Sequence, residues 1–206
     1  MRDKNTIETE KSRKTRQKII DTYFQLIETK DFDKITVRAI VETAGISRGA
    51  FYLYFTDIYE IITETEDMLL GSMPAFSRCH IPAGSGERAI YKLAEDTNSL
   101  WEREWLEHYQ KYSFYYNALL GSHGDSGFYF KVVKFLRSSL NVQMNSSQMP
   151  DDEVRQHFLE FLPDLFLSLA RQWTSDNKLA DLSLDMITQI LSTIKIGSQY
   201  RYHSGN

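Results

Sequence analysis

The sequence has little of what secreted, membrane-spanning or β-rich proteins are built from. Its 206 residues include one cysteine, Cys79, so the chain can form no internal disulfide and no cysteine-based zinc site. No apolar run approaches the roughly 18 residues that cross a bilayer, and the best stretch, residues 161–170, contains Pro163 and Asp164. The polar N-terminus lacks the apolar core of a signal peptide. We therefore expect a soluble, cytoplasmic protein with no membrane partner.

Strand-like alternation of polar and apolar residues is also missing, and apolar residues recur instead at helical spacing. The predicted helices cover residues 12–29, 36–44, 47–53, 57–73, 87–119 (as one helix or two), 128–140, 150–173 and 183–195. Pro163 is a possible kink in the helix that begins at Pro150. Residues 80–86, 121–127 and the NSSQ segment are predicted loops. The predicted fold class is all-α.

Charge is distributed unevenly along the chain. Residues 1–56 carry a net charge of +3, whereas residues 57–206 carry −7. A basic end on an acidic body indicates either a nucleic-acid contact confined to the N-terminus or a solvated basic tail.

The segment from Thr36 to Phe55 has the pattern of a helix-turn-helix. Thr36 and Ser47 are placed as N-caps, and Gly45 lies at the turn. Apolar positions such as Ile40 and Phe51 would fill the space between the two helices. The second helix then leaves an exposed face of small and polar residues, which fits the DNA major groove: Ser47, Arg48, Gly49, Ala50, Tyr52 and Tyr54.

This segment and its flanks resemble the DNA-binding domain of TetR-type transcriptional regulators over about residues 12–60. The resemblance is carried by Arg16, Ile19-Ile20 and Phe24, by Phe32 and Ile35-Thr36-Val37, and by the run AGISRGAFYLYF followed by Asp57. It implies a three-helix N-terminal domain over residues 10–56 and a helical C-terminal domain over residues 57–206 that binds an effector and dimerises. The DNA contacts that we expect are Arg16, Thr36, Val37, Arg38, Ser47, Arg48, Gly49, Ala50, Tyr52 and Tyr54.

One position departs from the family pattern. Ile58 stands where most relatives have a lysine, shortly after the last Phe of the motif. One phosphate contact is therefore lost unless amide groups at the start of the next helix, or the basic residues of the first helix, replace it.

In the C-terminal region, the series Phe114-Tyr115, Leu119-Leu120, Gly124-Asp125 and Phe128, with Trp173 before the last helix, more loosely resembles TetR-type regulators of low-GC Gram-positive bacteria. These include activators of dihydroxyacetone-kinase operons, which use a protein partner. Its aromatic residues are either core or the lining of an effector pocket. The pocket candidates are Trp101, Trp105, Tyr109, Phe114, Tyr115, Phe158 and Phe161. The last two helices are either core or a two-fold interface, and the dimer candidates are Leu165, Leu169, Trp173, Ile187, Leu191 and Ile194.

Motifs with catalytic or metal-binding potential are weak. The GDSG run at residues 124–127, beside His123, imitates a protease nucleophile loop, but the chain has no predicted strands to build such an enzyme. Glu104 and His108 have the spacing of a shared metal ligand pair, although a surface pair is the simpler interpretation. We expect no enzyme, no metal and no cofactor.

The predicted function is that of a dimeric, sequence-specific DNA-binding regulator. In the first form, it is a repressor that binds a palindromic operator in double-stranded DNA and is released by a small-molecule effector. In the alternative, it is an activator or adaptor whose C-terminal domain binds a protein partner. A closed, packed aromatic cluster would favour the alternative, and an open pocket would favour the effector.

Overall fold

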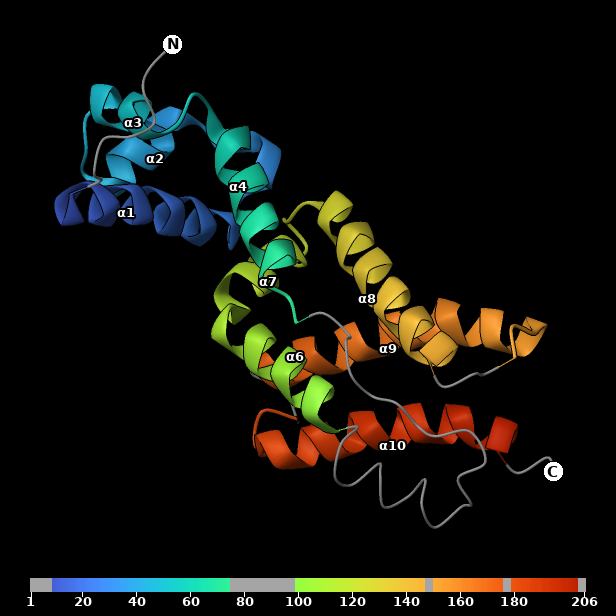
Figure 1. Cartoon of the computed structure of the whole chain (residues 1–206). Coiled ribbons are helices and arrows are strands. Elements are labelled where there is room, and N and C mark those ends of the chain that lie inside the picture. The colour runs from blue at the N-terminus through green and yellow to red at the C-terminus, as the bar shows by residue number, and fades with distance from the viewer. Residues whose placement is uncertain (1–8, 75–98, 147–149, 176–178, 204–206) are drawn as a thin grey trace. The chain divides into compact units, whose positions relative to one another are not determined.

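The structure, a computed structural model, describes residues 9–74, 99–146, 150–175 and 179–203 (Figure 1). Every regular element within these ranges is a helix, which confirms the all-α prediction. The chain divides into two compact units, one formed by Met1–Met68 with Ala118–Ser126 and the other by Leu69–Asn117 with Gly127–Asn206. None of the described helices combines the length and the apolar character that crossing a membrane requires.

The first unit is built on a helix-turn-helix. Its elements are α1 (Glu10–Ile27), the 3-10 turn η1 (Phe32–Lys34), α2 (Val37–Ala44), α3 (Arg48–Tyr54) and the greater part of α4 (Ile58–Gly71). Helix α2 packs against both α1 and α3. Their apolar faces form one core, since these side chains are all at most 8% exposed: Ile19, Ile20, Tyr23, Phe24, Ile27, Ile35, Ile40, Val41, Ala44, Phe51 and Phe55.

The second unit is built around helix α6 (Ser99–Lys111), which packs against α9 (Glu153–Thr174) and α10 (Leu184–His203). It also contains most of α7 (Ser113–Leu119) and of α8 (Ser126–Ser146). Asp152 caps α9 by accepting a hydrogen bond from the amide of Arg155 at 2.9 Å.

Some helix ends differ from the predicted ones, because α8 and α10 continue through Gly127 and Gly197, which lie next to their predicted ends. Helix α8 extends beyond the predicted 128–140 at both ends, and α10 continues to His203 instead of ending at residue 195. The described part of the predicted 87–119 segment forms two helices, α6 and α7. Pro163 lies inside α9, which continues through it as one helix. The predicted loop at residues 80–86 and Cys79 lie outside the described residues.

The short segment between α7 and α8 belongs to the first unit rather than to the helices that flank it. Residues 118–126 pack beside the connector that joins α1 to α2. The amide of Phe32 donates to the carbonyl oxygen of His123 at 2.9 Å. The predicted domain boundary at residues 56 and 57 stays a prediction.

Candidate nucleic-acid interface

The turn between α2 and α3 fixes how the second helix is presented. Gly45 has φ 64° and ψ 40°, the left-handed backbone conformation that is unfavourable for residues with a Cβ and that glycine adopts readily. The amide groups of Gly45 and Ile46 both donate to the carbonyl oxygen of Val41, which closes the end of α2. Phe51 is fully buried on the inner face of α3. The short helix is therefore held by its apolar side, and its other side is left to solvent.

The outer face of α3 carries most of the predicted base contacts. Ser47 is the N-cap, and its Oγ accepts a hydrogen bond from the amide of Ala50 at 3.1 Å. Arg48, Gly49 and Tyr52 are exposed, whereas Ala50 and Tyr54 are half-buried. Among the described residues, the Arg48 guanidinium has neither a hydrogen-bond partner nor an ion-pair partner. It is therefore available to a guanine edge or a phosphate, both of which accept the paired donors of arginine.

The start of α2 presents a second group of predicted contacts. Thr36 is the N-cap as expected, since its Oγ1 accepts from the amide of Ala39 at 3.2 Å and its O–H remains able to donate. Val37 is half-buried. Arg38 Nε donates to Glu42 Oε1 at 2.7 Å, and both side chains are more than half exposed. An exposed pair of this kind stabilises a protein little, so a phosphate can take the place of Glu42.

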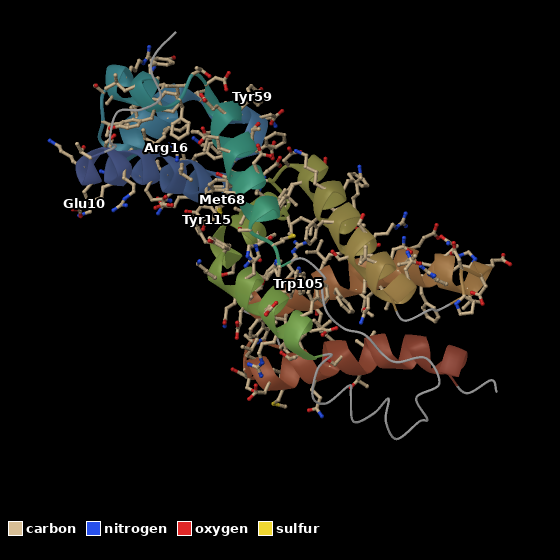
Figure 2. All side chains as sticks on the ribbon, in the orientation of Figure 1. Glu10, Arg16, Tyr59, Met68, Trp105 and Tyr115 are labelled. Carbon is tan, nitrogen blue, oxygen red and sulfur yellow. The ribbon has the colours of Figure 1, made fainter. Side chains whose placement is uncertain are left out.

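Arg16 is already engaged within the first unit. Its guanidinium pairs with the carboxylate of Glu64 on α4 and lies 4.9 Å from the centroid of the Phe55 ring (Figure 2 labels Arg16 on α1). A half-buried cation over an aromatic face, with a carboxylate beside it, ties α1 to α4 and to the end of α3. That Arg16 also contacts DNA stays a prediction.

The start of α4 is less favourable for a phosphate contact than the sequence suggested. Asp57 Oδ1 accepts a hydrogen bond from the amide of Glu60 at 2.9 Å. Glu60 Oε2 accepts from the amide and the hydroxyl of Thr56, at 2.6 and 2.9 Å. This reciprocal pattern is similar to a capping box, and it places two carboxylates beside Ile58. The spacing of Asp57 and Glu60 was the signal that could have revealed it.

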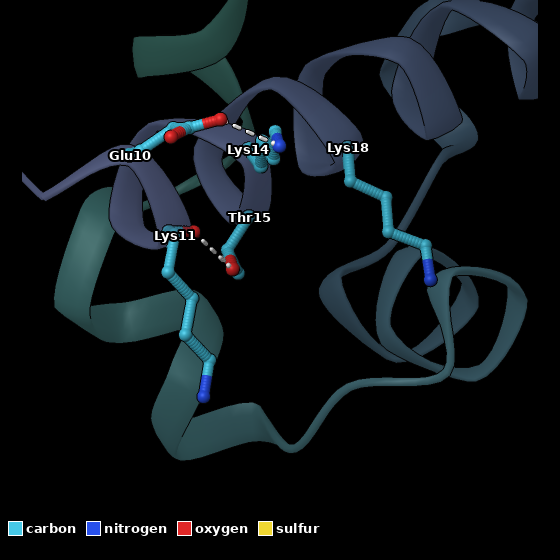
Figure 3. A pocket seen from close by; sticks show the side chains of 5 residues that line it. All are labelled: Glu10, Lys11, Lys14, Thr15 and Lys18. Carbon is cyan, nitrogen blue, oxygen red and sulfur yellow. Dashed lines mark hydrogen bonds and ion pairs between the residues drawn. The ribbon is translucent and has the colours of Figure 1, made fainter.

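A row of lysines on α1 adds positive charge to the first unit. Lys11, Lys14 and Lys18 share one helical face and line a shallow hollow with Glu10 and Thr15 (Figure 3). Lys14 Nζ pairs with Glu10 at 2.7 Å. The ammonium groups of Lys11 and Lys18 have no ion-pair partner among the described residues, and Figure 3 shows both extending away from Glu10. These two charges are free to approach a phosphate backbone.

In the second unit, three of the predicted pocket aromatics lie in the core. Trp101, Trp105 and Tyr109 follow one another along α6 (Figure 2 labels Trp105) and are at most 4% exposed. Their rings lie next to one another in sequence: Trp101 and Trp105 are stacked with centroids 6.4 Å apart, and Trp105 and Tyr109 are tilted with centroids 5.8 Å apart. Phe166 of α9 lies against both tryptophans at 6.2 and 6.3 Å. Tyr116 continues the stack from Tyr109 at 4.4 Å. The core interpretation of the cluster therefore fits these residues.

One polar atom inside that stack is unusual. Trp105 Nε1 is buried and has no hydrogen-bond partner among the described residues. A buried N–H without an acceptor costs about 1–3 kcal/mol, so such groups call for an explanation.

The other predicted pocket residues lie elsewhere. Phe114 and Tyr115 contact each other on α7, where Phe114 is 39% exposed. Phe158 and Phe161 instead line an apolar groove on α9, and Phe161 is 68% exposed. The structure therefore does not bring the seven predicted pocket aromatics together.

Some of the predicted dimer residues lie in the core of the second unit, and others line the apolar groove. Trp173, Ile187 and Leu191 are at most 5% exposed and pack inside the second unit, and Leu169 is half-buried. Leu165 and Ile194 line the apolar groove of α9, which we define by its seven lining residues. They are Phe158, Phe161, Leu162, Asp164, Leu165, Ser168 and Ile194.

The histidines of the weak catalytic and metal motifs contact side chains that belong to neither a catalytic nor a metal site. His123 Nδ1 lies 2.8 Å from Asp31 Oδ1, and the loop that holds it connects two helices. His108 Nε2 lies 3.1 Å from the hydroxyl oxygen of Tyr116, and burial, followed by the charge of Lys111, lowers the pKa of His108 to about 4. Within the described ranges, no three His, Cys, Asp or Glu side chains gather closely enough to hold a metal.

Comparison with known proteins agrees with this geometry. Two solved structures have a similar fold over most of the chain. One is a "dihydroxyacetone kinase operon activator DhaS", with a TM-score of 0.56 and 13% identity over 92% of this chain and 98% of that one. The other is the fatty acid degradation regulator FadR from Bacillus halodurans, with a TM-score of 0.52 and 12% identity over 89% and 95%. At these identities the likeness concerns the fold alone, and no curated protein matches the sequence.

The sequence itself matches a family model, described as bacterial regulatory proteins of the tetR family, over residues 19–65. These residues run from the buried face of α1 through the capped helices α2 and α3 into α4. The match shows that residues 19–65 are similar to the DNA-binding domain of tetR-family regulators, and it supports a TetR-type DNA-binding transcriptional regulator.

Proposed function

We propose that the chain acts as a dimeric, sequence-specific repressor that binds a palindromic operator and is released by a small-molecule effector. The observation that carries the DNA-binding part is the exposed face of α3, where Arg48, which has no partner in the part of the chain that the structure describes, stands beside Gly49. A helix whose outer face is small and polar can enter the major groove deeply enough for its N-terminal residues to meet base edges. The readout of sequence is therefore assigned to Ser47, Arg48, Gly49 and Ala50.

In the proposal, residues around the exposed face of α3 contact the phosphates of the DNA backbone. The hydroxyl groups of Thr36, Tyr52 and Tyr54 can donate to phosphate oxygens, and Arg38 can exchange Glu42 for a phosphate. Since carboxylates occupy the start of α4, the lysine face of α1 is assigned the compensating positive charge. No arrangement of nucleophile, base and orienting residue supports an enzymatic role among the described side chains.

The apolar groove of α9 supports dimer formation through a second copy of the chain. Its residues 158, 161, 165 and 168 recur at helical spacing on one face, and Leu165 is 42% exposed. A helical stripe of this kind is self-complementary across a two-fold axis, so one patch serves both subunits. Two α3 helices would then meet successive major grooves of a near-palindromic site.

The effector part rests on the buried Trp105. A ligand with a hydrogen-bond acceptor would supply the partner that Trp105 Nε1 lacks among the described residues. A Trp105→Phe variant keeps an aromatic ring and removes this donor, so it should lose effector response while still binding DNA.

The alternative is an activator or adaptor that binds a protein partner. It is favoured by the closely packed row of rings from Trp101 to Tyr116, in which each side chain is at most 4% exposed. Under this alternative, small molecules never change DNA binding.

The test is binding of the purified chain to the DNA immediately upstream of its own gene, measured by fluorescence anisotropy at two salt concentrations. Specific binding that falls steeply with salt supports the DNA interface, because phosphate contacts release counterions. Binding no tighter than to random DNA would contradict it for this target. A compound screen on the bound complex then separates the two forms, since release by a small molecule favours the repressor.

A further inference from the structure

The loop between α7 and α8 holds the connector that leads into α2. We call residues 28–36 the α1–α2 connector and residues 121–125 the latch loop. His123 of the latch loop lies with Nδ1 2.8 Å from Asp31 Oδ1, and Asp31 also pairs with Lys34. These contacts hold the pKa of Asp31 below its usual value, the bond from His123 contributing most and Lys34 next. The carboxylate therefore stays ionised and remains an acceptor throughout the neutral range.

The backbone of the connector is fixed at the same place. The amide of Phe32 donates to the carbonyl oxygen of His123 at 2.9 Å, and its carbonyl oxygen accepts from the hydroxyl of the buried Tyr23 at 3.4 Å. Both polar backbone groups of Phe32 are thus taken. Three residues later, Ile35 is 1% exposed and anchors the connector just before Thr36, the N-cap of α2.

The latch loop has a shape that only glycine allows. The amide of Gly124 donates to the carbonyl oxygen of Gly121 at 3.2 Å. A Cβ on Gly124 would lie 2.1 Å from the carbonyl oxygen of Leu119 and 2.4 Å from that of Ala118. Those atoms are backbone, so any side chain at this position forces the turn to open and displaces His123.

We propose that His123 is a positioning residue for DNA binding: through Asp31 and the amide of Phe32 it sets the place of the α1–α2 connector and hence of Thr36 and Arg38. The residue lies 92 positions from Asp31 in sequence, outside the segment that matches the family model. The inference rests on the proposed function for its effect on DNA, but the positioning itself can be measured without DNA.

The DNA test compares operator affinity in His123→Ala, His123→Asn and a control, His157→Ala. His157 is exposed on α9, and the ion pairs that it makes with described residues are loose, at 3.7 and 4.0 Å. We expect His123→Ala to weaken binding about two- to fivefold, as for loss of a partly exposed charged contact. His123→Asn should restore much of it, because an amide nitrogen can donate from the same branch. His157→Ala should leave affinity unchanged.

Double variants separate positioning from a general loss of structure. If His123 acts through the start of α2, its effect should shrink in an Arg38→Ala background and persist in full in an Arg48→Ala background. Equal, additive losses in both backgrounds, or no loss at all, would overturn the proposal.

Amide hydrogen exchange supplies the readout that needs no DNA. In His123→Ala and Gly124→Ala, the amide of Phe32 should exchange about tenfold faster, while the amide of Ile46, bonded to Val41 at 3.0 Å, stays unchanged. Unchanged exchange at Phe32 in both variants would overturn the inference. If the parent chain bound no operator, the proposed function would fail, and the exchange result would still decide whether His123 positions the connector.

Discussion

Three arginines of the first unit differ in what already surrounds them. Arg16 is shared between Glu64 and the Phe55 ring, Arg38 has one exposed carboxylate partner, and Arg48 has none among the described residues. A contact with DNA must stabilise the complex more than the interaction that it replaces stabilises the free chain. The order of the three arginines therefore predicts how much each contributes to DNA binding. Arg48 should contribute most to operator binding and Arg16 least.

Replacing Arg48 with alanine tests that order. We expect Arg48→Ala to weaken operator binding by roughly 1–3 kcal/mol and to relax the preference at one base pair, because arginine pairs with guanine through two donors. Arg38→Ala should cost less, since Glu42 must first be displaced. Lys134→Ala, which removes an exposed charge from α8, is the matched control. Equal affinity of the Arg48→Ala variant and the parent chain would remove Arg48 from the interface.

His108 gives the second unit a pH dependence. Its pKa is about 4 in the folded chain, against an ordinary 6.5 in the unfolded one, because burial disfavours the charged ring. Between these values the unfolded chain binds a proton that the folded chain does not. The free energy of unfolding should therefore fall as the pH is lowered from about 6.5 toward 4, by on the order of 1 kcal/mol given the partial exposure of the ring.

Urea denaturation at pH 7, 6 and 5 would measure this fall. His108→Gln cannot take up a proton, so its stability should fall less steeply over the same range than that of the parent chain. Identical slopes for the two proteins would show that His108 does not titrate in this way.

At the scale of the element, local residues decided most of what could be predicted. Thr36 and Ser47 were recognised as N-caps because a capping side chain needs only an amide three residues on, which the sequence displays. The start of α8 and the end of α10 were misplaced because each helix continues through a glycine next to its predicted end, Gly127 and Gly197, and a glycine weakens a helix without always ending it. The other end of α8 passes residue 140, where no Gly or Pro stands. The pairing of Arg16 with Glu64 depends on how two helices cross, and no local pattern records that.

The turn between α2 and α3 can be tested with two glycines. Gly45→Ala should destabilise the chain by about 1–2 kcal/mol, because its φ of 64° is unfavourable for any residue with a Cβ, although no atom would clash. Gly71→Ala, at the end of α4, has equally open space and no positive φ. It should be neutral or stabilising by a few tenths of a kcal/mol. Thermal unfolding of both variants checks the contrast, and equal effects would contradict it.

At the scale of the whole molecule, assembly should depend on the apolar groove of α9. Phe161 and Phe130 are each 68% exposed, on α9 and α8 respectively, so a charge at either position should leave the fold of one chain intact. We expect Phe161→Glu to shift the protein to monomers and to lower operator affinity at least tenfold, because two linked half-sites bind more tightly than one. Phe130→Glu should change neither property. Sedimentation velocity and operator titration measure both, and a dimeric Phe161→Glu variant would exclude this interface.

The sequence could not assign the aromatic residues to core or groove. Trp101 and Phe161 have similar spacing to their apolar neighbours, yet the first is 4% exposed and the second 68%. Periodicity identifies a helical face but not the surface that covers it. The exposed face of α3 was easier to predict, because Phe51 is buried on the opposite side and leaves the polar face to solvent. That this face contacts DNA stays a prediction.

The division of the chain into units has a consequence for protein engineering. The DNA-binding unit is discontinuous, because it takes in residues 118–126 as well as the N-terminal segment. A chimera that grafts only residues 1–68 onto another regulator would leave the partner of Phe32 and Asp31 behind. A transplant of DNA specificity should therefore carry the nine residues from Ala118 to Ser126 along with the helices.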